Sequence, residues 1–215
     1  MTSARNEFGL RKILVATDLS PRAEKAVARA MQLAEQHNSA LTVVHVLSVA
    51  AKDKTRTRET AAKIEEDLRR KVHVRSHRNG RSVKIRVLSG TPFVEIIRRA
   101  RAEEADLILA GAHGTDFLKD LLVGSTAQKV VRKGDRPVLI VKQAARSLYR
   151  RVLVAVDFSE DSRRALEVAL RLAPPQSFTS CTPIKDSKDG SGERISHPPR
   201  LRNIVTSWQN KNAKR

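Results

Sequence analysis

The chain repeats itself after 139 residues: ILVATDLSPRAEKAVARAMQLA at residues 13–34 returns as VLVAVDFSEDSRRALEVALRLA at residues 152–173, with nine of 22 positions identical. Each copy starts with an apolar run rich in β-branched residues and continues through Asp-x-Ser, which favours the start of a helix. Each copy ends in apolar residues at helical spacing. The repeat therefore predicts a strand, a turn and a helix in each copy, and limits the fold to one that is built from such units.

The alternation of strand and helix continues between the two copies. Further strands are predicted at residues 41–47, 84–90, 106–114 and 136–142, and further helices at residues 50–71, 92–105 and 124–131. Nearly continuous apolar strands that are joined by helices indicate a parallel sheet with both faces covered. We expect an α/β fold with a doubly wound, five-stranded parallel sheet of the Rossmann-like or flavodoxin-like type, in the strand order 3-2-1-4-5.

The second copy opens a domain that the sequence does not continue in the same pattern. The repeat predicts an apolar strand soon after Ala173, and we find no run that resembles residues 41–47 there. The remaining segment holds five of the eight prolines of the chain and many polar residues, a composition that favours disorder. We predict a first domain at 10–143, a linker at 144–150, an incomplete second domain at 151–173, and a disordered basic tail at 174–215.

Composition narrows the cellular setting. Cys181 is the only cysteine, which excludes an internal disulfide framework and a cysteine-based zinc site. No apolar run approaches the roughly 20 residues that cross a bilayer. The apolar stretch near the N-terminus is interrupted by Asp18, unlike a secretory signal. We expect a protein of the reducing cytoplasm without a membrane partner.

The ends of two predicted strands carry unusual residues. Thr17 and Asp18 follow the first strand, and Gly111, His113 and Gly114 follow the fourth. In an open doubly wound sheet, ligands bind beyond the carboxyl ends of the strands, where the strand order reverses. For the order 3-2-1-4-5 that point lies between these two strands, so topology and residue types predict one crevice.

A second group of residues suits a phosphate. Gly124, Ser125 and Thr126 open a predicted helix, whose free amide groups and positive dipole attract anions. Gly111 and Gly114 let the backbone approach a ligand closely. Together the two groups predict a split cradle for an anionic ligand.

The segment GAHGTDFLKDLLVGS at residues 111–125 resembles the ATP-binding branch of the universal stress protein family, whose motif has Gly, two residues, Gly, nine residues, Gly, and Ser or Thr. The resemblance extends over residues 10–143. It includes ILVATDLS, VVHV, SGTPFVEII, ADLILAGAHG and RPVLIVK. Tandem pairs of such domains occur in this family, which fits the second copy at Val152.

The resemblance implies ATP as the ligand, bound with Mg or Mn. Ala16, Thr17 and Asp18 would line its nucleoside end, and the backbone of Val46 would meet adenine. Gly111, His113 and Gly114 would follow the ribose and diphosphate, and Gly124, Ser125 and Thr126 would hold the terminal phosphates. Asp18 would take a ribose hydroxyl, an adenine edge or the metal. Many family members have a basic residue after the second glycine; here stand Thr115 and Asp116, and an acidic side chain there weakens polyphosphate binding.

Several of these residues also have a purely structural interpretation. Asp18 and its counterpart Asp157 both suit the start of a helix, with or without a ligand. His45 lies within a predicted buried strand. A histidine in such a strand more often makes hydrogen bonds within the protein core than it binds a ligand. His73 and His77 are spaced like a helical metal pair, but no carboxylate or cysteine completes the set, so we interpret them as surface residues.

Other functions remain as alternatives. The first is a nucleotide-free interaction protein of the same fold. The second is a nucleic-acid binder, because residues 52–86 hold 13 Lys and Arg against five Asp and Glu within a chain of net charge +19. A solvated helix face is the commoner meaning of such a charge run. Since the sequence has neither a P-loop nor a Gly-x-Ser-x-Gly motif, we expect slow ATP hydrolysis at most.

The fifth predicted strand suggests how the protein associates. In dimers of the family this strand commonly forms the contact, and an apolar edge strand tends to pair with another chain. The second domain of a complete tandem protein could cover that edge, but the incomplete copy does not supply such a cover. We therefore predict a homodimer through residues 137–142.

Overall fold

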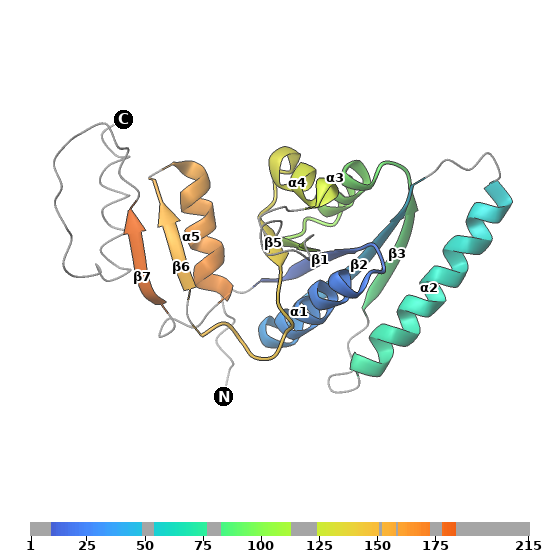
Figure 1. Ribbon diagram of the computed structural model, residues 1–215, viewed down its shortest axis with the longest axis horizontal. Helices are drawn as coiled ribbons and strands as arrows, with labels where there is room; N and C mark the ends of the chain where they lie inside the picture. Colours follow the sequence, from blue (N-terminus) through green and yellow to red (C-terminus); the bar gives the residue numbers. More distant parts are fainter. Residues whose placement is uncertain are drawn as a thin grey trace. The chain divides into compact units, whose positions relative to one another are not determined.

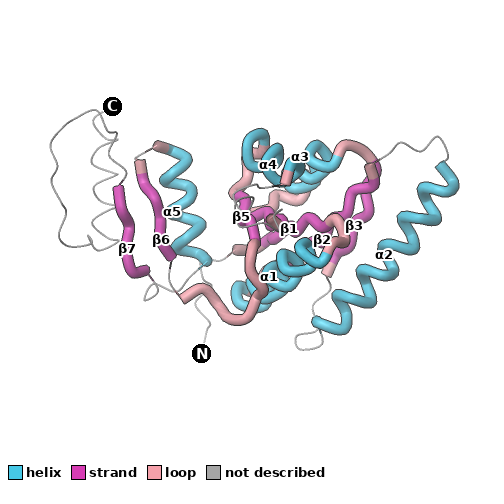
Figure 2. Tube along the Cα trace, in the orientation of Figure 1, coloured by secondary structure: helices cyan, strands magenta, loops and turns pink. Residues whose placement is uncertain are grey.

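Five parallel strands form the sheet of the N-terminal unit in the computed structural model, which describes residues 10–48, 54–76, 83–112, 124–150, 152–157, 159–172 and 178–183 (Figures 1 and 2). The strands are β1 (Lys12–Thr17), β2 (Ala40–Leu47), β3 (Lys84–Ser89), β4 (Leu107–Gly111) and β5 (Val138–Val141). They lie in the order β3-β2-β1-β4-β5, and every neighbouring pair is parallel. This confirms the predicted fold class and strand order.

Helices cover both faces of this sheet. They are α1 (Pro21–His37), α2 (Lys54–Ser76), α3 (Pro92–Ala102) and α4 (Ser125–Lys133). Figure 1 shows α1 on one side of the sheet and α3 with α4 on the other. Leu14 of β1 packs in one buried cluster with Ile96 of α3 and Val130 of α4. Because successive residues of a strand face opposite sides, Leu14 and Val15 are both 0% exposed.

The central strands are fixed to each other at their amino ends. Asp106 precedes β4, and its carboxylate accepts hydrogen bonds from the backbone N–H groups of Arg11 and Lys12, at 2.7 and 2.9 Å. The N–H of Asp106 in turn donates to the carbonyl of Lys12 at 2.8 Å. These polar contacts hold the amino ends of β1 and β4 together.

Most element boundaries agree with the sequence prediction. The strands predicted at 41–47, 84–90 and 136–142 correspond to β2, β3 and β5. Helix α2 extends to Ser76, beyond the predicted end at residue 71. The reason is packing: Val72 continues the apolar stripe of Leu68, and both side chains are 5% exposed. The fourth strand ends at Gly111.

The second unit contains a smaller copy of the first β-α-β arrangement. The chain divides into Met1–Arg146 and Ser147–Arg215, a boundary within the predicted linker 144–150. The described elements of the second unit are β6 (Val152–Val156), α5 (Glu160–Leu172) and β7 (Phe178–Pro183). None of the described helices in either unit is long and apolar enough to span a membrane.

Strand β7 corrects the prediction that no strand follows Ala173. It pairs in parallel with β6, from Val152 opposite Phe178 to Val156 opposite Pro183. Its position is the one that the repeat requires, because the start of β2 shifted by 139 residues falls at residue 179. The sequence FTSCTP lacks a continuous aliphatic run, so pairing with β6 decides its conformation. The rest of the predicted tail, residues 174–177 and 184–215, lies outside the described residues.

The start of the helix has the same hydrogen bonds in both copies. Asp18 accepts from the N–H of Ser20 at 3.0 Å, and the hydroxyl of Ser20 accepts from the N–H of Ala23 at 3.2 Å. In the second copy, Asp157 accepts from the N–H of Ser159 at 2.9 Å, and Ser159 accepts from the residue three positions later at 3.1 Å. Hydrogen bonds from Ser159 lower the pKa of Asp157 to about 2. Asp-x-Ser therefore starts a helix in each copy, as predicted.

Candidate functional site

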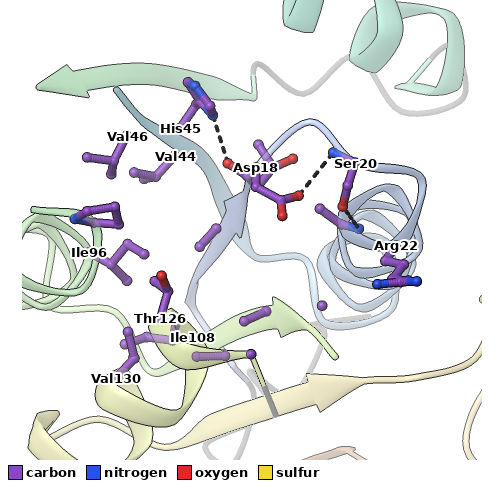
Figure 3. Close-up of a pocket in the computed structure, with 18 of the residues that line it drawn as sticks. Asp18, Ser20, Arg22, Val44, His45, Val46, Ile96, Ile108, Thr126 and Val130 are labelled. Atoms are coloured by element: carbon purple, nitrogen blue, oxygen red, sulfur yellow. Dashed lines mark hydrogen bonds between the residues drawn. The ribbon is translucent and has the colours of Figure 1, made fainter. Parts of the chain in front are cut away.

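A cavity of about 170 Å³ opens at the carboxyl ends of the central strands (Figure 3). The ends of β1, β2 and β4 and the first turns of α1, α3 and α4 line it. It lies where the strand order reverses, since β1 is flanked by β2 on one side and β4 on the other. This is the place that the topology of a doubly wound sheet predicts for a ligand.

The turn after β1 forms a rigid polar wall of the cavity. Thr17 is 8% exposed, and its hydroxyl accepts the N–H of Leu19 at 3.0 Å. Leu19 has a φ of 67°, a left-handed conformation that this bond helps to hold. Asp18 lies at the exposed mouth and, as Figure 3 shows, turns toward Ser20. Asp18 therefore both lines the cavity and supports the helix start, so the two interpretations of this residue are compatible.

His45 stands beside this turn at the end of β2. Its Nδ1 lies 2.9 Å from the carbonyl oxygen of Thr17 (Figure 3). A carbonyl oxygen only accepts, so Nδ1 is the donor in this contact. This contact is a hydrogen bond within the protein, of the kind that the structural interpretation of His45 predicts. The half-buried ring also lines the cavity, next to Val46.

Gly111 brings the end of β4 close to α1. A Cβ atom at this position would lie 3.1 Å from the carbonyl oxygen of Arg22 and 3.2 Å from the Cα of Ala23. Contacts this short require the neighbouring backbone to shift, which a helix turn resists. Glycine is therefore needed here for packing of strand against helix, a role in addition to the predicted approach to a ligand.

The first turn of α4 forms the opposite wall. Gly124 is the N-cap, and no side chain makes a capping hydrogen bond there. By contrast, the start of α1 is capped by Ser20. Ser125 and Thr126 both line the cavity. The amide groups and the positive end of the α4 dipole are the features of the cavity that suit an anion.

Comparison with known proteins decides the family. The model of the universal stress protein family matches residues 9–142, well over half of the chain. The chain belongs to the universal stress protein family. The universal stress protein domain thus coincides with the five-stranded sheet and the cavity at its carboxyl edge.

Individual members of the family are related at moderate identity. Universal stress protein MJ0577 of Methanocaldococcus jannaschii is 41% identical over 64 residues, which are 30% of this chain and 40% of that protein. Universal stress protein MJ0531 of the same organism is 28% identical over 140 residues, covering 62% of this chain and 82% of that protein. A universal stress protein solved in complex with cAMP matches with a TM-score of 0.50 and 25% identity, over 62% of this chain and 98% of that one.

The predicted site residues meet in this universal stress protein domain. Eight of them line the cavity: Ala16, Thr17, Asp18, Val46, Gly111, Gly124, Ser125 and Thr126. The other two, His113 and Gly114, lie outside the described residues, as do Thr115 and Asp116. Strand ends and helix starts far apart in the sequence therefore converge as the topology predicts.

Sequence reasoning missed two further groups of lining residues. Ser20 and Arg22 belong to the first turn of α1, and Arg22 is the single Lys or Arg among the described residues that line the cavity. The position of Arg22, four residues after Asp18, was an available signal. Ile96, Ile108 and Val130 form an apolar wall, which Figure 3 shows opposite Asp18 and Ser20. An apolar wall residue has the same pattern as a core residue, so no sequence signal separates the two.

The chemistry of the donors limits how a metal could bind. Within the described ranges, no three His, Cys, Asp or Glu side chains lie close enough together to hold a metal ion. Asp18 is the one carboxylate among the described lining residues. A site with one carboxylate fits Mg²⁺, which is commonly held by one or two carboxylates together with substrate phosphates. The protein residues thus suit a metal that arrives with a phosphate ligand.

Proposed function

We propose that this universal stress protein binds ATP, with Mg or Mn, in the cavity at the carboxyl ends of β1 and β4. One observation carries the proposal: the eight described residues that the ATP-binding motif implies all line the same cavity. The bound nucleotide would act as a regulatory ligand in the cytoplasm and would bias the conformation or the association of the protein. The single cysteine of the chain, Cys181, fits that reducing compartment.

Different lining residues suit the two ends of a nucleotide. Ile96, Ile108 and Val130 make part of the lining apolar, and Val46 offers backbone groups to the base, as the family motif implies. Ser125 and Thr126 add hydroxyl groups to the amides at the start of α4. A bound Mg²⁺ would neutralise phosphate charge, with Asp18 as its protein ligand.

The sequence motifs favour binding over turnover. Fast hydrolysis requires a group that orients or activates water beside the terminal phosphate. The sequence has neither a P-loop nor a Gly-x-Ser-x-Gly motif, which are two arrangements that supply activated groups. We therefore propose slow hydrolysis at most. We also propose a homodimer through residues 137–142 and a second unit derived from a second copy of the same domain.

Titration calorimetry of the full chain with ATP, ADP, AMP and cAMP, each with and without Mg²⁺, tests the proposal directly. We expect ATP with Mg²⁺ to bind most tightly, because the metal and the amides of α4 act on the same phosphates. Mass analysis of small molecules that are released from the freshly purified protein is the independent measurement. If none of the nucleotides binds and none copurifies, the chain is a nucleotide-free interaction protein instead.

Removing the positive charge of Arg22 is expected to weaken ATP binding about tenfold. A charge-assisted hydrogen bond contributes about 1.5 kcal/mol or more, and about 1.4 kcal/mol corresponds to tenfold. Arg22→Gln makes this change in the first turn of α1. Lys25→Gln is the matched control, because Lys25 lies on the same helix, is exposed and does not line the cavity. Equal losses in both variants would mean that only the overall charge acts, and Arg22 would have no specific contact.

A further inference from the structure

The turn between β1 and α1 is held by hydrogen bonds from two directions. Within the turn, the hydroxyl of Thr17 accepts the N–H of Leu19 at 3.0 Å. From the neighbouring strand β2, Nδ1 of His45 donates to the carbonyl oxygen of Thr17 at 2.9 Å (Figure 3). Thr17 and His45 are also direct partners in the pairing of β1 with β2. A side chain at the end of one strand therefore fixes the turn that follows its neighbour.

This turn needs to be held, because Leu19 has a left-handed backbone. Its φ is 67°, a conformation that residues other than glycine rarely adopt. Leu19 is also 37% exposed, so burial of its side chain contributes little to keeping it there. Asp18 lies between Thr17 and Leu19 and lines the cavity. The hydrogen bonds of Thr17 therefore determine where the backbone places Asp18.

The second copy of the repeat lacks this arrangement. Val156 stands at the position of Thr17, 139 residues later, and its partner in the neighbouring strand β7 is Pro183. The corresponding pair in the first copy is Thr17 with His45. Valine has no hydroxyl group and proline has no side-chain donor, so neither hydrogen bond has a counterpart in the second pair.

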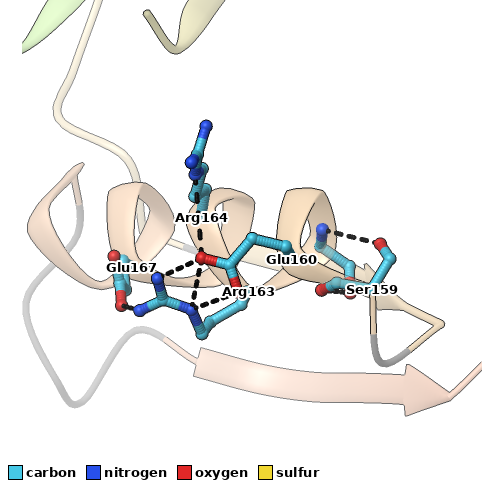
Figure 4. Close-up of polar contacts among 6 residues, drawn as sticks. Ser159, Glu160, Arg163, Arg164 and Glu167 are labelled. Carbon is cyan, nitrogen blue, oxygen red and sulfur yellow. Dashed lines mark hydrogen bonds and ion pairs between the residues drawn. The ribbon is translucent and has the colours of Figure 1, made fainter. Parts of the chain in front are cut away.

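Helix α5 of the second copy begins in the usual way in spite of that difference. Asp157 accepts the N–H of Ser159 at 2.9 Å, the same bond as in the first copy. Figure 4 shows Ser159 at the start of α5, where Arg163 forms an ion pair with Glu160. The Asp-x-Ser pattern is therefore sufficient to start a helix. The additional bonds of the first copy are not needed for that purpose, and the feature that they border is the cavity.

We propose that His45 is a positioning residue of the nucleotide site, because its bond to Thr17 holds the turn that places Asp18 at the ligand. This inference rests on the proposed function and names a residue that controls the affinity of the same site. When the bond is lost, the turn adopts other conformations as well. The affinity for the nucleotide then falls in proportion to the fraction of molecules that keep the binding conformation.

Two substitutions separate the hydrogen bond of His45 from its ring. His45→Leu removes the donor, and we expect Mg-ATP to bind about fivefold more weakly, as for the loss of one neutral hydrogen bond. His45→Asn keeps an N–H group close to the place of Nδ1, because both nitrogens are two bonds from Cβ, so its affinity is expected to stay within about twofold of the wild type. His37→Leu is the matched control, since His37 is also half-buried and does not line the cavity.

A measurement without nucleotide tests the turn directly. The N–H of Leu19 donates to Thr17, so its hydrogen exchange, followed by NMR, reports whether the turn is closed. His45→Leu is expected to speed this exchange about fivefold, the same factor as the loss of affinity. His45→Asn and His37→Leu are expected to leave it unchanged. His45→Phe keeps a ring but has no donor, and it provides the same test if leucine at this position destabilises the sheet.

Titration calorimetry of the full chain and the exchange of the Leu19 N–H together decide the proposal. A folded His45→Leu protein that binds Mg-ATP like the wild type overturns it. So does an equal loss of affinity in His45→Leu and His45→Asn with unchanged exchange, because the ring would then contact the nucleotide itself. If the wild type binds no nucleotide, the proposed function fails, and the exchange of the Leu19 N–H alone decides whether His45 positions the turn.

Discussion

Gly124→Val is expected to lower the affinity for ATP at least about a hundredfold while the protein stays folded. Gly124 caps α4 with φ and ψ of −52° and 148°, values that any residue can adopt. The backbone therefore does not require glycine here. A β-branched side chain at the start of the helix would instead stand between a phosphate and the amides of the first turn. Two lost charge-assisted hydrogen bonds, at about 1.5–3 kcal/mol each, account for the expected size of the effect.

Titration calorimetry with Mg-ATP measures this loss, and thermal unfolding with circular dichroism reports the fold. Gln128→Val is the matched control, because Gln128 lies one turn further along α4, is exposed and does not line the cavity. Since Gly124 itself is buried, Gly124→Ala provides a smaller change for which we expect an intermediate loss of affinity. Unchanged affinity in a folded Gly124→Val protein would place the phosphates elsewhere.

The predictable part of the site follows from strand ends and helix starts. Thr17 and Asp18 end an apolar run, and Ser125 and Thr126 follow a glycine that opens a helix. Both features can be recognised in the sequence, and the topology of a doubly wound sheet brings them to one edge of the sheet. Arg22 was missed, although it lies in the first turn of the helix that begins after Asp18 and Ser20, and that turn lines the cavity.

The parts that were not predictable depend on partners distant in the sequence. β7 contains Thr, Ser and Pro, and it is a strand because β6 lies beside it. Leu14 and Leu153 occupy equivalent positions of the two repeat copies, yet one is fully buried and the other mostly exposed. The difference comes from α3 and α4, about 80 to 115 residues after Leu14. Local pattern thus specifies strand and helix, whereas burial depends on what the rest of the chain supplies.

The proposed dimer rests on the position of β5 at the margin of the sheet. Within the described residues, β5 pairs with β4 and with no other strand. Leu139 and Ile140 are half-buried, whereas Val141 is 4% exposed and belongs to the interior of its own domain. An apolar edge strand offers unpaired backbone groups as well as apolar side chains. When two copies pair about a twofold axis, the backbone groups form hydrogen bonds and the side chains are buried.

Leu139→Lys is therefore expected to shift the protein from dimer to monomer, with at least a tenfold weaker association. A charge on an edge strand opposes pairing with another chain. Because both protomers of a twofold dimer carry the substitution, the interface loses two apolar contacts. Val141 is left unchanged, because a lysine at that buried position would unfold the domain rather than test its edge. Val131→Lys is the control, since Val131 is 50% exposed and lies on α4, not on the edge strand. Sedimentation velocity over a range of concentrations measures the association: a wild type that stays monomeric refutes the dimer, and equal effects of the two variants would place its interface away from β5.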